Sequence, residues 1–259
     1  MRVVGVHEDV LVCTSAIWQT TCTIVRGPAV AGDEQAAREA FVVDSPVLPH
    51  ELEALTALLG QVGWPCSGLL ATHGDWDHLL GRLAFPDAAL GVAETTAARL
   101  TGEPGAAARE LRAFDEQHYV ERGRPLQLGQ LQALPVPGKL EVGAGELELH
   151  PTEGHVPDGM AIWIPWAKVL VCGDFLSPVE IPMLSEGGSR SAYRATLERL
   201  RDLVEQADHV VPGHGAVLDG VRAAAILRDD LAYLETLDLP LARRSAEQRR
   251  VHESNLERW

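Results

Sequence analysis

Four short apolar stretches of this chain each end in a turn rich in histidine, aspartate and glycine, and this arrangement constrains the fold most. The first stretch, "CSGLL", runs into "ATHGDWDH" at positions 71–78. Further along the chain, the turns "TEGH", "CGD" and "PGHG" follow other apolar stretches. Turns at strand ends are places where a rigid sheet can direct side chains from distant segments toward one point. We therefore expect strands whose ends converge on a single site.

The segments between these turns predict strands followed by helices, twice over. The first 45 residues contain short β-branched stretches typical of strands, and 49–64 predicts a helix that begins near a proline. Strand-like stretches resume at 145–174, and amphipathic helices are expected over 191–207 and 219–237. The last of these has Asp219 as its expected N-cap. This order predicts two sheets packed together with helices outside them.

The length of 259 residues fits one large domain, and 46% hydrophobic residues are ample for a core. We expect a single domain over 1–259, with an insertion near 103–140 and a C-terminal helical extension. The insertion is placed over the active face, where Phe114 and Tyr119 could form an apolar lid. The stretch "PVEIPML", at 178–184, could form another wall of the site.

Net charge disfavours some partners of this chain, and its cysteines and N-terminus indicate its compartment. The net charge of −15 disfavours nucleic acid and anionic membranes, whose phosphates attract Lys and Arg. The four cysteines form no CxxC pair, and His7, Glu8 and Asp9 interrupt any signal-peptide core. We therefore expect a cytoplasmic protein that acts on a small-molecule substrate and does not insert into a membrane. The sequence does not indicate an oligomeric state.

The cluster at 73–78 has the composition of a metal site. His73, Asp75, Asp77 and His78 offer imidazole and carboxylate ligands, which suit Zn²⁺, Fe or Mn²⁺. If the chain coils at the strand end, His73 and Asp75 can serve one metal while Asp77 and His78 serve a second. The cluster therefore indicates a binuclear centre.

The order HxDxDH, a distant GH, then GD, then PGHG resembles the metallo-β-lactamase superfamily of binuclear metallohydrolases. The resemblance implies an α+β fold of the four-layer αββα sandwich type. It also implies two divalent metal ions, zinc first, with iron or manganese as alternatives. The implied ligands are His73, Asp75 and His155 for one ion, Asp77, His78 and His214 for the other, and Asp174 as a bridge between them.

Asp75 departs from the family pattern, which most often has histidine at this position. A carboxylate is a harder ligand than imidazole and shifts preference modestly toward iron or manganese. Three carboxylates and one bridging hydroxide would balance two divalent ions. Two possibilities stay open: Asp75 binds a metal directly, or it contacts a residue that does.

The resemblance implies a hydrolase in which a metal-bridging hydroxide attacks an ester, thioester, lactone or related bond. We also expect Asp77 to act as a catalytic residue that holds or accepts the proton of the water. The alternative is a diiron oxidoreductase or oxygen-dependent enzyme of the same fold. Hydroxyacylglutathione hydrolases of this superfamily bind an anionic thiol through basic residues in a C-terminal helical region. The comparable residues here are Arg243, Arg244, Arg249 and Arg250, for which a solvated helix face is the favoured interpretation.

Overall fold

The computed structural model describes residues 1–29, 38–240 and 242–258. The expectation that the first 45 residues form strands includes 30–37, which lie outside the described residues. Within the described ranges, no helix has both the length and the apolar character needed to cross a membrane.

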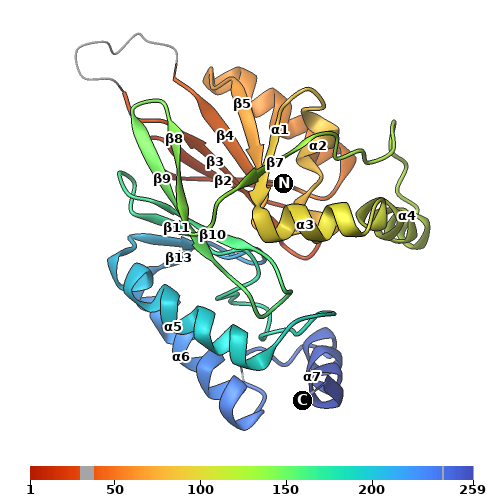
Figure 1. Cartoon of the computed structure of the whole chain (residues 1–259), viewed down its shortest axis with the longest axis vertical. Coiled ribbons are helices and arrows are strands. Elements are labelled where there is room, and N and C mark those ends of the chain that lie inside the picture. The colour runs from red at the N-terminus through yellow and green to blue at the C-terminus, as the bar shows by residue number, and fades with distance from the viewer. Residues whose placement is uncertain (30–37, 241, 259) are drawn as a thin grey trace.

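Two sheets form the centre of the molecule (Figure 1). The first sheet has seven strands in sequence order: β1 (Arg2–His7), β2 (Val10–Thr14), β3 (Thr21–Arg26), β4 (Ala40–Asp44), β5 (Cys66–Leu70), β6 (Leu90–Ala93) and β7 (Leu131–Leu134). The second sheet has six, in the order β13 (Leu218–Asp219), β12 (His209–Val211), β11 (Val169–Val171), β10 (Met160–Ile164), β9 (Gly145–Pro151) and β8 (Gly138–Val142).

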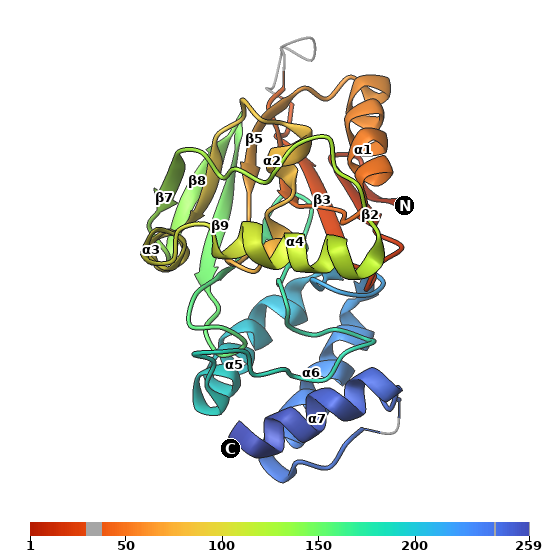
Figure 2. The ribbon, with the colours of Figure 1, turned by 90° about the vertical axis from the view of Figure 1, so that its right-hand side faces the viewer.

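Helices cover the outer face of each sheet (Figures 1 and 2). Those beside the first sheet are α1 (Pro49–Val62), α2 (Gly81–Ala84), α3 (Glu94–Gly102) and α4 (Ala106–His118), together with a short 3-10 turn, η1 (Trp76–His78). Those beside the second sheet are α5 (Arg190–Gln206), α6 (Gly220–Thr236) and the C-terminal α7 (Ala246–Arg258).

Alternation along the strands divides the apolar side chains among three cores. Leu69 packs toward α1 and α4, whereas its neighbour Leu70 faces the other sheet. In the second sheet, Val169 faces the space between the sheets, and Leu170 packs toward α5 and α6. Because successive side chains of a strand point to opposite faces, each sheet is buried on both sides. The predicted four-layer αββα sandwich is therefore confirmed.

Local signals determine where several helices begin. Asp219 caps α6, as predicted, by accepting a hydrogen bond from the Arg222 amide at 2.7 Å. Pro49 occupies the first turn of α1, which ends where Gly63 adopts the left-handed conformation. The segment 103–140 contributes α4, the edge strand β7 and the start of β8; β8 was not predicted.

Glu51, in the first turn of α1, is fully buried and ties the helix to the loop that follows β2. Its carboxylate accepts hydrogen bonds from the Ser15 hydroxyl at 2.6 Å, the Ala16 amide at 2.8 Å and the Leu48 amide at 3.2 Å. Burial raises the pKa of Glu51, but these hydrogen bonds outweigh burial and lower its pKa below the ordinary value. The ionised form is therefore the one that stabilises the fold.

We expect Glu51→Gln to lower the free energy of unfolding by about 1–3 kcal/mol at neutral pH, because buried donors lose a charged acceptor. The folded-state pKa is depressed, so this stabilisation is present above the unfolded value of about 4.3 and disappears as the pH falls through the folded value. Urea unfolding of wild type and variant, from neutral pH to below the folded pKa, measures this stabilisation. Glu53→Gln, on the exposed face of α1, is the control. If the difference in unfolding free energy between wild type and Glu51→Gln stayed constant at acidic pH, the stabilising role of ionised Glu51 would be contradicted.

Candidate metal centre

The turns after β5, β9, β11 and β12 reach one point at the edge of the two sheets, as the sequence predicts. Three overlapping groups of described residues bring ligand atoms within 4.8 Å of one another: His73, Asp75 and His155; His73, His78 and Asp174; and Asp77, His78 and His214. All seven predicted site residues belong to these groups. The 3-10 turn η1 turns Asp77 and His78 away from the extended backbone at Asp75, which separates the two halves of the cluster.

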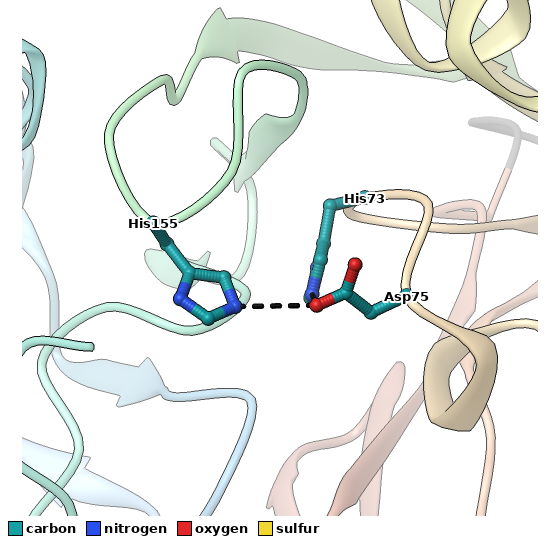
Figure 3. A group of neighbouring side chains, drawn as sticks. All are labelled: His73, Asp75 and His155. Atoms are coloured by element: carbon teal, nitrogen blue, oxygen red, sulfur yellow. Dashed lines mark ion pairs between the residues drawn. The ribbon is translucent and has the colours of Figure 1, made fainter. Parts of the chain in front are cut away.

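The first half joins two loops that are far apart in sequence (Figure 3). Asp75 Oδ2 lies 3.4 Å from His155 Nε2 and 3.6 Å from His73 Nε2. The second half is built in the same way around Asp77. Its Oδ2 atom lies 3.5 Å from His214 Nε2 and 3.7 Å from His78 Nε2.

Asp174 divides its two oxygens between the halves. Oδ2 lies 3.3 Å from His155 Nε2 and 3.7 Å from His73 Nε2. Oδ1 lies 3.2 Å from His78 Nε2 and 3.4 Å from His214 Nε2. Ligands about 2.0–2.1 Å from a tetrahedral ion lie about 3.3–3.4 Å apart, so these separations fit two such ions with Asp174 between them.

Each imidazole places Nε2 at the centre and Nδ1 against another part of the protein. The partners of Nδ1 are the Thr72 hydroxyl for His73 (3.1 Å), the Asp44 carboxylate for His78 (3.1 Å), the Met183 carbonyl for His155 (2.9 Å) and the Trp18 carbonyl for His214 (3.2 Å). Such partners fix ring orientation and tautomer in metal sites. The Nε2 atoms of His73, His78 and His155, and Asp174 Oδ1, are buried without a hydrogen-bond partner, which fits ligands directed at a cation.

The electrostatics of the centre favour ionised carboxylates. Burial raises the pKa of Asp75, but His155 and His73 outweigh it and hold the pKa of this carboxyl well below its usual range. Burial likewise raises the pKa of Asp174, and His214 and His78 outweigh that effect. Burial lowers the pKa of His214, yet Asp174 and Glu180 raise it to about 10. The electrostatics of the centre therefore favour the binding of cations.

Arg99, in α3, contacts the residue that departs from the family pattern. Its guanidinium donates from Nη2 to Asp75 Oδ1 and from Nη1 to Asp158 Oδ1, both at 2.8 Å. Asp158 also accepts from the Gly74 amide at 3.0 Å. Asp75 thus keeps Oδ2 at the centre while Oδ1 is held by Arg99, and the geometry places Asp75 at ligand spacing.

Sequence reasoning missed the roles of Arg99, Asp44 and Trp18, and it included Glu180 only as part of the predicted wall at 178–184. Asp44 ends the apolar strand "AFVVD", and a carboxylate at the end of a strand was the signal available in the sequence. In the structure its φ is +57°, a conformation that is rare for non-glycine residues. Its carboxylate accepts from the Thr72 amide at 2.8 Å and faces His78. Burial raises the pKa of Glu180 to about 7. None of these contacts is local in the sequence.

A cavity of about 550 Å³ opens in front of the centre. The predicted wall at 178–184 is confirmed, since Glu180, Ile181 and Met183 line it. The wall is held in part by α7, where Gln248 accepts from the Ile181 amide at 2.8 Å. The predicted lid is wrong for Tyr119, which is 94% exposed and is not among the lining residues described.

Phe114, the other residue of the predicted lid, lies behind the cavity wall. It is buried against the rings of Trp18, at 5.2 Å, and Trp76, at 4.9 Å, and both of these tryptophans line the cavity. Phe114 therefore supports an aromatic wall without lining the cavity itself.

One of the four C-terminal arginines, Arg243, does not belong to the solvated helix face that we expected. Arg244, Arg249 and Arg250 are exposed, but Arg243 is buried and lies 2.5 Å from buried Asp230. Arg243 also donates to the Glu180 carbonyl at 2.7 Å. It therefore supports the loop behind the cavity and does not belong to a solvated helix face.

Gly213 lies so close to Asp174 that any side chain would displace it. A Cβ atom at this position would meet Asp174 Oδ1 at 2.1 Å and the Gly173 carbonyl carbon at 2.9 Å. We expect Gly213→Ala to lower the number of bound divalent ions to about half or less, because the bridging carboxylate would move. Equilibrium dialysis with zinc measures this. Gly102→Ala, where the Cβ meets nothing within 4 Å, is the matched control, and equal zinc binding by both variants would contradict the role of Asp174.

Comparison with known proteins identifies relatives of this chain. The hydroxyacylglutathione hydrolase of Jannaschia sp. (strain CCS1) is 25% identical over 176 residues, which are 68% of this chain and 59% of that protein. The chain thus spans less than two thirds of that relative's length.

Two solved structures share the fold. A metallo-beta-lactamase from Pontibacter korlensis matches with a TM-score of 0.65 at 18% identity, covering 91% of this chain and 99% of that one. A metallo-beta-lactamase family protein from Thermus thermophilus matches with a TM-score of 0.67 at 19% identity, covering 89% of this chain and 81% of that one.

The sequence model of the metallo-beta-lactamase superfamily matches residues 32–214, a range that runs from before β4 to His214 and includes every loop of the candidate centre. With the sandwich and the convergent turns described above, this match confirms the predicted resemblance: the chain belongs to the metallo-beta-lactamase superfamily.

Proposed function

We propose that this protein is a metal-dependent hydrolase that holds two divalent ions. The observation that carries the proposal is the division of the Asp174 carboxylate, with one oxygen 3.3 Å from His155 Nε2 and the other 3.2 Å from His78 Nε2. The buried, unpartnered Nε2 atoms around it support the same conclusion. In this proposal His73, Asp75 and His155 hold one ion, and Asp77, His78 and His214 hold the other.

Two divalent ions, when bound, lower the pKa of water toward neutrality and polarise a carbonyl or phosphoryl oxygen. The residues of the chain prepare this chemistry. Asp77 lines the cavity and is placed to accept a proton from the attacking water. The carbonyls of Trp18 and Met183 hold His214 and His155 in position, so that their Nε2 atoms stay directed at the centre.

The bond cleaved is proposed to be an ester, thioester, lactone or related bond of a small molecule. The cavity volume of about 550 Å³ is typical of small-molecule sites. The name of the relative from Jannaschia supports a thioester within this group. The net charge of −15 supports a substrate other than nucleic acid. Cytoplasmic location stays a prediction.

Replacing His155 by Ala should lower kcat/KM toward thioester and ester substrates by about 100-fold or more, because one ion would lose a ligand and Asp174 a neighbour. Zinc content, measured by mass spectrometry, should fall toward one ion per chain. His50→Ala, on the exposed face of α1, is the matched control and should behave as wild type. Retention of full activity and two zinc ions by the His155 variant would overturn the proposed function.

A diiron oxidoreductase or oxygen-dependent enzyme is the second candidate, and the carboxylate at Asp75 is the observation that favours it. With Asp75 in one half and Asp77 in the other, each half of the centre has two imidazoles and two carboxylates, counting Asp174 for both. Oxygen ligands suit iron and manganese better than imidazole does.

Elemental analysis of protein purified without added metal separates the two candidates. We expect about two zinc ions per chain and metal-dependent hydrolysis, with no oxygen consumption in the presence of a reductant. Two iron atoms per chain with reductant-driven oxygen consumption, and no hydrolysis by the zinc-loaded protein, would favour the second candidate.

A further inference from the structure

We infer that the cavity in front of the metal centre selects substrates that carry a positively charged ammonium-type group. This inference rests on the proposed hydrolytic function and adds the class of substrate. It is carried by three features of the cavity: uncompensated carboxylates, an arginine whose charge is already neutralised, and a fixed pair of tryptophans.

The cavity has more carboxylates than its metal centre can use. Beyond Asp75, Asp77 and Asp174, five acidic side chains line it: Glu103, Glu110, Glu180, Glu186 and Glu247. No described residue forms an ion pair with any of these five within 4.0 Å. They come from both sides of the opening, from the α3–α4 region, from the segment before α5 and from α7. Carboxylates of one sign around a recessed site attract cations and repel anions.

Arg99 is the one arginine or lysine among the described lining residues, and it does not offset this charge. Arg99 donates to Asp75 and Asp158, both at 2.8 Å, so its guanidinium is shared between two aspartates. In the centre itself, three aspartates and one hydroxide would balance two divalent ions. Glu103, Glu110, Glu186 and Glu247 therefore remain as net negative charge that faces the substrate, whereas Glu180, whose pKa burial raises to about 7, adds less.

Two tryptophans supply a surface that suits an ammonium group. Trp18 and Trp76 both line the cavity, with ring centroids 5.6 Å apart in an edge-to-face arrangement. Glu110 lies one helical turn before Phe114 in α4, and Phe114 packs against both rings. Aromatic rings beside carboxylates bind ammonium groups through cation–π attraction and charge.

The position of Trp18 is fixed relative to the centre. Its backbone adopts the left-handed conformation, with φ of +52°, which persists only where the surroundings enforce it. Its carbonyl lies 3.2 Å from His214 Nδ1. A cation held by this ring would therefore lie at a set distance from the bond to be cleaved.

An anionic thioester is correspondingly disfavoured. Arg244, Arg249 and Arg250 are not among the described residues that line the cavity, and α7 presents Glu247, Gln248 and Val251 to it instead. The C-terminal helix thus places negative charge where a carboxylate-bearing thiol would need positive charge. The chain's own residues distinguish it from a hydrolase of anionic thioesters.

Three thioacetates that differ mainly in charge test the inference. They are S-acetylthiocholine, its neutral isostere 3,3-dimethylbutyl thioacetate, and S-acetyl-3-mercaptopropionate, each assayed with the zinc-loaded full chain by thiol release. We expect kcat/KM to be at least about tenfold higher for the cation than for the neutral isostere, and lowest for the anion. The preference should shrink as salt is raised.

The double variant Glu103→Gln/Glu110→Gln should reduce the ratio of cationic to neutral kcat/KM by about fivefold or more. Glu116→Gln, on the exposed face of α4, is the matched control and should keep the wild-type ratio. Unlike a loss of folding, a change in this ratio reports the charge of the cavity. A ratio unchanged in the double variant would overturn the assignment of these carboxylates.

Failure of the inference is distinguishable from failure of the proposed function. Hydrolysis of all three compounds without a preference for the cation, or with preference for the anion, would overturn the inference and leave the hydrolase intact. If none is hydrolysed, binding decides: tetramethylammonium should quench tryptophan fluorescence more than methanesulfonate at equal ionic strength, and less in the double variant. Equal effects of the two ions would overturn the inference in that case.

Discussion

The convergence of three aspartates, one buried and two half-buried, on one point is the constraint on which the rest of this structure depends. Asp75, Asp77 and Asp174 lie within one shell of imidazole nitrogens, and like charges in a poorly solvated space repel strongly. The imidazoles that face them gather positive charge in response, as the raised pKa values of His78, His155 and His214 indicate. Two divalent ions held by these residues would satisfy the same demand.

Holding that arrangement requires contacts from both sheets and from segments outside them. Asp44, at the end of β4, faces His78, while the Trp18 carbonyl, before β3, faces His214. The Met183 carbonyl faces His155 and lies in a segment that α7 supports through Asn255. The sandwich thus positions the four short loops that meet at the centre. Its three apolar cores pack the strands from which these loops begin.

The centre and the cavity in front of it have different roles. The seven ligand-type residues determine the class of reaction, and they follow the pattern of the superfamily except at Asp75. The glutamates and tryptophans of the wall determine which molecule can approach. Arg99 connects the two, because it donates to both Asp75 and Asp158 and contributes no free charge to the cavity. The proposed preference for ammonium-bearing substrates follows from this separation.

Local patterns in the sequence predicted most of the strands, the main helices, the N-cap at Asp219 and the seven residues that meet at the centre. These could be predicted because each depends on a local pattern: alternation, helical periodicity, or a ligand-bearing turn directly after a strand. Tertiary structure alone decided that Arg99 holds Asp75, that Asp44 faces His78, that Arg243 is buried against Asp230, and that Tyr119 is exposed. These contacts join residues on different elements, and only the packing of those elements brings them within hydrogen-bonding distance or keeps them apart.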